Sequence, residues 1–128
     1  MIVDTSALAA VLFREADAER YEDAIARADT CRISVANLLE LFIVVESHGG
    51  TAAGQECDVF LDEAGIDPEP VTPEHAQQAR LAWRRFGRGN HPAGLNFGDC
   101  FAYALARTTG EPLLFKGEDF ARTDIEAA

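Results

Sequence analysis

The feature of this sequence that most constrains its fold is a set of short apolar runs separated by longer helical patterns. The runs cover residues 2–3, 31–35 and 113–115, and they show little alternation between polar and apolar side chains. Strands that are buried on both faces have this character, and helices between them lead to a parallel sheet. We therefore expect an α/β fold, a three-layer α/β/α sandwich with a short, mainly parallel sheet.

The expected helices follow from apolar residues spaced three and four apart and from start and stop signals. Thr72-Pro73-Glu74 is a strong start signal, because it combines a cap, a proline at the first helical position and an acid near the positive end of the helix. Pro68 and Pro70 predict that residues 66–71 are extended. A last edge strand is expected at residues 123–125. The helices are expected over residues 7–13, 17–28, 36–47, 51–64, 72–86 and 97–109.

Length and composition restrict the class of protein. A chain of 128 residues with 48% hydrophobic residues suits one domain, expected over residues 1–128. No segment approaches the roughly 20 uninterrupted apolar residues that cross a bilayer, and no secretion signal is recognised, so we expect a cytoplasmic protein. Cys31, Cys57 and Cys100 match neither a redox pair nor a zinc site, and we expect them to be buried.

The charge balance argues against nucleic acid as a partner, except in one segment. The chain has 22 acidic and 11 basic residues, a net charge of −11, which repels a polyanion. Residues 75–98 contain no acid, and Trp83 and Phe86 stand among their arginines. This pattern is typical of binding to phosphates, although a basic helix end that suits the helix dipole is an alternative. Trp83 is read either as a core or dimer anchor or as a base-stacking platform. The arginines are Arg80, Arg84, Arg85 and Arg88.

Three acids stand where the hydrophobic pattern predicts burial. Asp4 ends the first strand, Glu40 lies in a helix that is apolar on all sides, and Asp99 lies in the first turn of another apolar helix. Helix capping is an alternative for Asp4 and Asp99, and an arginine partner for Glu40. Functional residues of such sheets collect at the carboxyl ends of the strands, and carboxylates brought together there repel one another. A hard divalent cation such as Mg²⁺ would relieve this repulsion.

Four segments of the chain, in this order and at these separations, resemble the PIN-domain family, and within it the VapC-type toxins of bacterial toxin-antitoxin pairs. The resemblance extends from Met1 to Ile125. It implies a ribonuclease that depends on Mg²⁺ or Mn²⁺, usually a homodimer, inhibited by a VapB-type antitoxin whose C-terminal segment enters the active-site groove. The segments are Met1-Ile2-Val3-Asp4-Thr5-Ser6-Ala7-Leu8, the isolated Glu40, Leu95-Asn96-Phe97-Gly98-Asp99-Cys100, and residues 113–125.

The resemblance also implies roles for individual residues. The acidic site of the family corresponds to Asp4, Glu40 and Asp99, and the fourth acid is assigned to Asp119, with Glu118 as the alternative. Many PIN domains have an aspartate at the position of Gly117, so this chain departs from the pattern there. In our hypothesis Asp4 and Asp99 ligate the metal, while Glu40 and Asp119 complete the acidic cavity and orient water or help to hold a second ion. The RNA would bind to Arg80, Arg84, Arg85 and Arg88, and cleavage would leave a 5′-phosphate and a 3′-hydroxyl.

Other classes of protein also use acids at strand ends. A receiver-type signalling module needs an acidic pair just after the first strand and a late lysine, for which Lys116 is available. A haloacid-dehalogenase-like phosphatase needs a second aspartate two residues after Asp4. This chain has Thr5 and Ser6 at those positions, which argues against both. A PIN-like protein that binds a partner without catalysis stays open as an alternative.

Overall fold

A central sheet of four parallel strands organises the computed structural model, which describes residues 1–128. The strands are arranged in the order β3-β2-β1-β4, and Ile2 of β1 lies between Arg32 of β2 and Leu113 of β4. The edge strand β3 accommodates Pro68, because an edge strand has one side without ladder hydrogen bonds. The parallel sheet predicted from the apolar runs is therefore confirmed. The strands are β1 (Ile2–Val3), β2 (Cys31–Ser34), β3 (Ile66–Glu69) and β4 (Leu113–Leu114).

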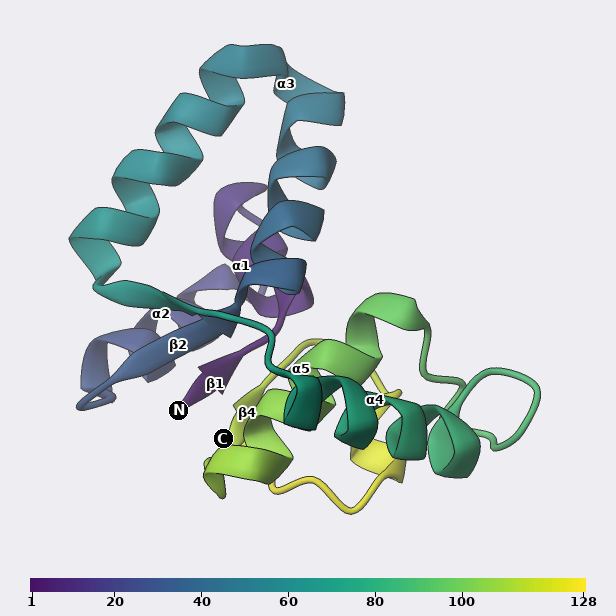
Figure 1. The fold of residues 1–128 in the computed structure, drawn as a ribbon. Helices are drawn as coiled ribbons and strands as arrows, with labels where there is room; N and C mark the ends of the chain where they lie inside the picture. The colour runs from purple at the N-terminus through teal and green to yellow at the C-terminus, as the bar shows by residue number, and fades with distance from the viewer.

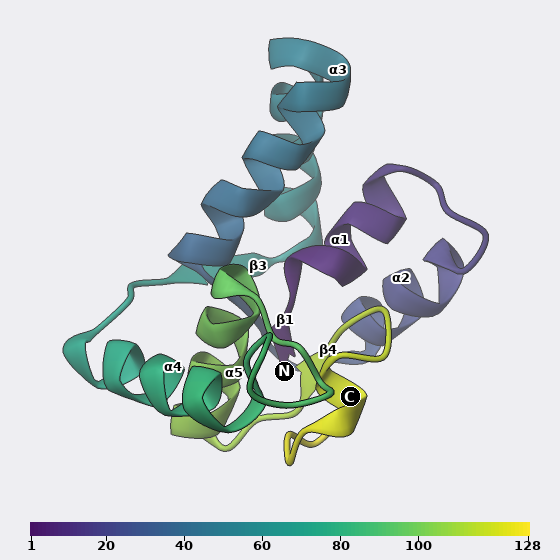
Figure 2. The same cartoon turned by 90° about the vertical axis from the view of Figure 1, so that its right-hand side faces the viewer.

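Helices cover both faces of this sheet (Figure 1 and Figure 2). Successive strand residues point to opposite faces, so Val3 packs in a core formed with α1, α2 and α3, whereas Ile2 packs in a second core with α4 and α5. This is the expected three-layer sandwich. The helices are α1 (Thr5–Leu12), α2 (Ala18–Arg27), α3 (Val35–Ala64), α4 (Pro73–Phe86), α5 (Phe97–Thr109) and the short 3₁₀ helix η1 (Phe120–Arg122).

Two expectations for the strands and helices are corrected by the structure. Residues 123–125 do not form an edge strand; instead Ala127 makes an isolated parallel bridge with Leu113. The helix around Glu40 is not buried on all sides, because Leu39 is 62% exposed and Ile43 is 58% exposed. The first part of α3 projects away from the sheet, so only its inner face reaches the core.

The remaining sequence expectations for the core agree with the structure. Cys31, Cys57 and Cys100 are buried free thiols. None of the helices combines the length and the apolar character that crossing a bilayer would require.

Helix α3 is folded back on itself at Gly50. The sequence predicts two helices here, and the structure joins them through Gly50, whose backbone adopts φ 67° and ψ −163°. This conformation is essentially restricted to glycine. The two halves, residues 35–49 and 51–64, form the projecting hairpin seen in Figure 1, and the second half returns the chain to β3.

We expect Gly50→Ala to lower the free energy of unfolding by about 1–3 kcal/mol, the cost of a side chain in a glycine-only backbone region. A Cβ at Gly50 would meet no atom within 4 Å, so the loss would come from the backbone conformation and not from a clash. Urea unfolding measures the change. The neighbouring exposed substitution Thr51→Ala serves as the control, with an expected change within about 0.5 kcal/mol. Equal stability of both variants would contradict a strained turn.

Candidate active site

Asp4 lies at the carboxyl end of β1 and caps helix α1. One carboxylate oxygen, Oδ2, accepts hydrogen bonds from the Ser6 amide at 2.9 Å and from the Ser6 hydroxyl at 2.6 Å. The side chain is almost fully buried, with 3% exposure, and its other oxygen, Oδ1, is buried without a hydrogen-bond partner. Burial raises the pKa of Asp4, the Ser6 hydrogen bonds oppose this shift, and the charge of Glu40 adds to it. Capping therefore explains one oxygen of Asp4 and leaves the other unpaired.

Asp99 faces the same region from the first turn of α5. It forms a capping box with Asn96. The backbone N–H of Asn96 donates to Asp99 Oδ2 at 3.0 Å, and the backbone N–H of Asp99 donates to Asn96 Oδ1 at 2.9 Å. Burial is the main cause that raises the pKa of Asp99 to about 7, against the Asn96 hydrogen bond. The negative charges of Asp4, Asp119 and Glu40 raise it further. Asp4, Asp119 and Glu40 are therefore close enough to Asp99 for their charges to act on its carboxyl group.

The two acids expected after β4 differ in their relation to Asp99. Both Glu118 and Asp119 are exposed, and Asp119 immediately precedes η1. The negative charge of Asp119 raises the pKa of Asp99, whereas Glu118 is not among the groups that shift this pKa most. Asp119 is therefore the better placed of the two to complete the acidic cluster of Asp4, Glu40 and Asp99.

Gly98 makes the approach of Glu40 to Asp99 possible. Glu40 is half-buried on α3, and its carboxylate lies directly over Gly98, where an added Cβ would stand 2.2 Å from Glu40 Oε2. A side chain at position 98 would therefore collide with the Glu40 carboxylate. Glu40 forms no ion pair, so the arginine partner considered from the sequence is absent.

Asn37 connects the elements that carry the acids, and the sequence did not single it out for the site. Its side chain is fully buried, and Nδ2 donates to the Gly98 carbonyl at 2.9 Å and makes a long contact of 3.5 Å with Glu40 Oε1. The backbone carbonyl of Asn37 accepts a hydrogen bond from the Thr5 hydroxyl at 3.1 Å. Asn37 thus touches Glu40 and the direct neighbours of Asp4 and Asp99. The available signal was a polar residue one turn before Glu40 in an otherwise apolar run.

Ser6 is a second residue that the sequence did not single out for the site. Its hydroxyl accepts from the Lys116 amide at 2.9 Å and donates to Asp4 Oδ2, so it joins the end of β4 to the end of β1. The Lys116 ammonium itself pairs with Glu15 and with Asp17 Oδ1, the latter at 2.7 Å, and both acids raise its pKa. Lys116 is therefore engaged outside the acidic cluster, unlike the late lysine of a receiver module.

The donor atoms at this site fit a hard divalent cation. Asp4 Oδ1 is buried and unpaired, and the surrounding side chains are carboxylates that repel one another. No three His, Cys, Asp or Glu side chains are arranged to hold an ion by themselves. Mg²⁺ keeps several waters and takes one or two carboxylates together with substrate phosphates, so this incomplete set of ligands suits it or Mn²⁺.

The four arginines predicted to bind RNA do not form one continuous stripe. Helix α4 ends at Phe86, so Arg88 lies in the following loop, yet Arg80 and Arg88 line the same cavity. Arg85 pairs with Asp124 at 3.3 Å and lies over the Phe86 ring at 4.8 Å. Arg80, Arg84 and Arg88 are exposed and form no ion pair, which leaves three of the four free for an anion.

Comparisons with known proteins agree with this arrangement. The family model of the PIN domain matches residues 1–126. A protein of Mycolicibacterium smegmatis named "Ribonuclease VapC" is 50% identical over 127 residues, which cover 99% of this chain and 98% of that protein. Among solved structures, VapC20 of Mycobacterium tuberculosis, described as a Sarcin-Ricin loop cleaving toxin, has a TM-score of 0.80 at 20% identity and covers 99% of this chain and 97% of its own.

A second structural neighbour is a chain of a toxin-antitoxin complex from Klebsiella pneumoniae. It has a TM-score of 0.74 at 15% identity, over 96% of this chain and 92% of that chain. At such identities the likeness to both solved structures concerns the fold, which is the same three-layer arrangement.

We expect Asp99→Asn to stabilise the metal-free protein near neutral pH. Folding raises the pKa of this carboxyl from 3.8 to about 7, so the folded state binds a proton more tightly than the unfolded chain. The ionised carboxyl therefore destabilises the fold increasingly as the pH rises from about 4 through about 7, and not below that window. Thermal unfolding in EDTA should show the variant melting several degrees higher at about pH 8, with a smaller gap at about pH 5 and none below about pH 4.

Two controls accompany this measurement. Asp67→Asn removes an exposed acid on β3 and should leave the melting temperature nearly unchanged at both pH values. Adding Mg²⁺ should stabilise the wild type more than Asp99→Asn, because a ligand stabilises the state that binds it. A wild type that melts above Asp99→Asn in EDTA at about pH 8 would contradict the repulsive cluster.

We expect Asn37→Leu to lower the free energy of unfolding by about 1–3 kcal/mol, because the buried Gly98 carbonyl would lose its donor. Asn90→Ala is the matched control: this exposed asparagine also donates to a backbone carbonyl, that of Trp83 at 3.0 Å, but water can replace it. Chemical denaturation of both variants tests the difference. Equal losses would show that Asn37 does not bridge the helices as described.

Proposed function

The chain belongs to the PIN-domain family, and on this basis we propose that it is an endoribonuclease, the toxin of a VapBC-type toxin-antitoxin pair. The observation that carries the proposal is the 50% identity to a protein named as a ribonuclease, and it is supported by the effect of the Asp4, Glu40 and Asp119 charges on Asp99. The substrate is RNA, and the reaction is hydrolysis of a phosphodiester bond.

We assign the metal to Asp4 and Asp99, and the completion of the acidic cavity to Glu40 and Asp119. When bound, Mg²⁺ or Mn²⁺ lowers the pKa of water and stabilises negative charge on the phosphate. Ser6 holds Oδ2 of Asp4, so the unpaired Oδ1 is the oxygen that would hold the cation. Glu40 and Asp119 orient the attacking water by accepting its hydrogen bonds.

The products follow from water as the nucleophile. Water adds to phosphorus, the bond from phosphorus to the 3′ oxygen breaks, and that oxygen leaves as a hydroxyl after taking a proton. The strand then ends in a 3′-hydroxyl on one side and a 5′-phosphate on the other. The Cys100 thiol does not compete as a nucleophile, because burial raises its pKa to about 11 and keeps it protonated.

Partners follow from charge and exposed apolar surface. A VapB-type antitoxin with a basic segment suits a chain of net charge −11, and one neighbour of the fold comes from a toxin-antitoxin complex. A homodimer is favoured by the exposed row of Val35, Leu39 and Ile43 along α3, which a second copy would cover. The buried free thiols suit the reducing cytoplasm, where we expect the protein to act.

We expect the purified protein, freed of antitoxin, to cut RNA with Mg²⁺ or Mn²⁺ and to stop in EDTA. Asp4→Asn should lower the rate by at least about 100-fold, in the range seen when one group that stabilises transition-state charge is removed. Gel analysis of RNA fragments measures the rate, and mass spectrometry identifies the fragment ends.

The control Asp67→Asn removes an exposed acid on β3 outside the cluster and should cut RNA like the wild type. Circular dichroism should show that both variants are folded. Cleavage that persists in EDTA would contradict the metal-dependent mechanism. A folded wild type that cuts no RNA with either metal would favour a PIN-like protein that only binds a partner.

A further inference from the structure

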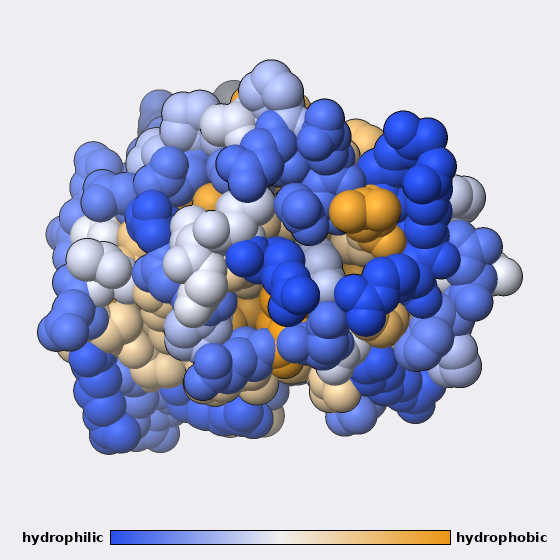
Figure 3. Space-filling model, turned by 60° about the horizontal axis from the view of Figure 1, so that its bottom comes forward, coloured by the Kyte–Doolittle hydropathy of each residue, from blue (hydrophilic) through white to orange (hydrophobic).

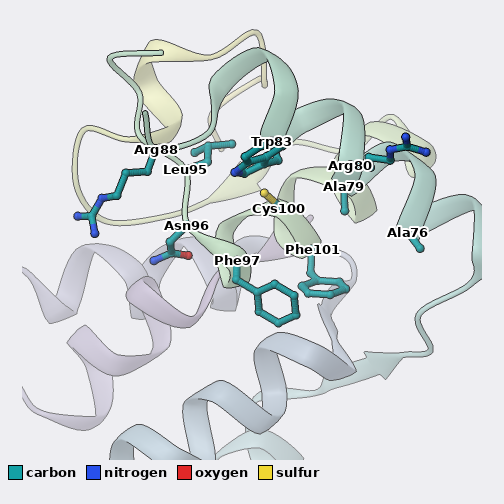
Figure 4. Close-up of a pocket in the computed structure, with 10 residues that line it drawn as sticks. All are labelled: Ala76, Ala79, Arg80, Trp83, Arg88, Leu95, Asn96, Phe97, Cys100 and Phe101. Atoms are coloured by element: carbon teal, nitrogen blue, oxygen red, sulfur yellow. The ribbon is translucent and has the colours of Figure 1, made fainter. Parts of the chain in front are cut away.

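A cavity of about 530 Å³ lies between α4 and the beginning of α5 (Figure 4). Its floor is apolar and includes Ala79, Leu95 and Cys100, which are buried. Its volume falls in the range of about 300–1,000 Å³ that small-molecule sites occupy. A single nucleobase with its ribose is small enough for such a cavity.

Two large aromatic side chains of this cavity are exposed to solvent. Elsewhere, the face of the molecule drawn in Figure 3 is mostly hydrophilic. Trp83 is 50% exposed and Phe97 is 81% exposed. Each is held from one side: the Trp83 indole lies against Gly87, where an added Cβ would stand 2.5 Å from Trp83 Cδ1. Phe97 packs edge-on against Phe101, with ring centroids 4.9 Å apart. The cavity therefore presents supported rings with open surface, as stacking platforms do.

The charge around the cavity is positive and unpaired. Arg80 and Arg88 lie at opposite ends of it (Figure 4), are exposed, and form no ion pair in a chain with 22 acids. An apolar segment of a protein partner has no need of two free guanidinium groups. A single-stranded nucleic acid requires both kinds of contact, aromatic faces for its bases and cations for its phosphates.

The cavity also adjoins the acidic cluster. Asn96 and Phe97 line it and directly precede Gly98 and Asp99, and Asn96 shares the capping box with Asp99. A base in the cavity would therefore belong to a nucleotide next to the phosphate at the acids.

We propose that this cavity binds one unpaired nucleobase of the RNA, next to the bond that is cut, by stacking on Trp83 and Phe97. Arg80 and Arg88 contact the phosphates on either side of that nucleotide. The assignment rests on the proposed ribonuclease function and adds to it a requirement for an unpaired base at the cleavage site.

The chain has a single tryptophan, so its fluorescence reports on the cavity directly. The probe is a short single-stranded RNA titrated into full-length Asp99→Asn protein with Mg²⁺, so that the strand stays intact. Saturable quenching of Trp83 is expected from a base that stacks on the indole. An abasic oligomer with the same number of phosphates should bind weakly and should not quench. Equal quenching by both oligomers would overturn base stacking.

Substitutions separate stacking from charge. Trp83→Ala should weaken RNA binding by about 5- to 150-fold, the range for loss of one base-aromatic stack, measured by fluorescence anisotropy of labelled RNA. Trp83→Phe should retain part of the affinity. Leu81→Ala is the matched control, because Leu81 is also a half-exposed apolar residue of α4 but does not line the cavity. Unchanged RNA affinity in Trp83→Ala would overturn the proposal.

The failure of this proposal and of the proposed function are distinguishable. If wild-type protein cuts RNA and Trp83→Ala binds and cuts it equally well, the cavity assignment fails and the ribonuclease stands. If RNA quenches Trp83 but the wild type cuts nothing, the ribonuclease function fails, and the cavity binds a base without a cleavage site beside it. If light scattering shows that Trp83→Ala turns a dimer into a monomer, the cavity belongs to a contact between two copies, and the proposal is overturned.

Discussion

The buried amide of Asn37 is the interaction on which the acidic cluster depends. Burial is the main cause of the raised pKa values of Asp4 and Asp99, and the negative charges of neighbouring carboxylates add a smaller repulsive effect in the same direction. The repulsion tends to separate α1, α3 and α5. Asn37 opposes the separation, because from its place on α3 its side-chain amide donates to Gly98 on α5 and its backbone carbonyl accepts from the Thr5 hydroxyl on α1. Buried hydrogen bonds of this kind are expensive to break, since the groups left behind have no water.

Much of the fold could be predicted because apolar patterns report local burial. The runs at β1 and β4 are wholly apolar, and these runs, separated by helical patterns, indicated a parallel sheet with two covered faces, although β2 carries Arg32 and Ser34. Asp4 and Asp99 stood out because each is polar at the edge of such a run. The exposure of Leu39 and Ile43 was not predictable in the same way, because an apolar row gives no information on whether this chain or another molecule covers it.

The parts of the site that the sequence did not reveal are those that depend on distant partners. Asn37 and Ser6 act through hydrogen bonds to Gly98 and Lys116, which are far away along the chain. Arg85 differs from the other arginines of its segment only because Asp124 reaches it from near the C-terminus. The spacing of residues along one helix does not indicate such long-range contacts. All four arginines were therefore predicted to bind RNA, although one of them is paired with an acid.

The absence of a side chain at Gly98 is as necessary to this site as the acids themselves. Glu40 occupies the volume that any larger residue at this position would fill, so a single added methyl group would push one acid away from the others without removing any of them. A chain with that change would keep every carboxylate of the motif and the whole sheet. Counting acids in a sequence therefore overestimates how many members of such a group are still enzymes, and the empty space beside the acids has to be counted as well.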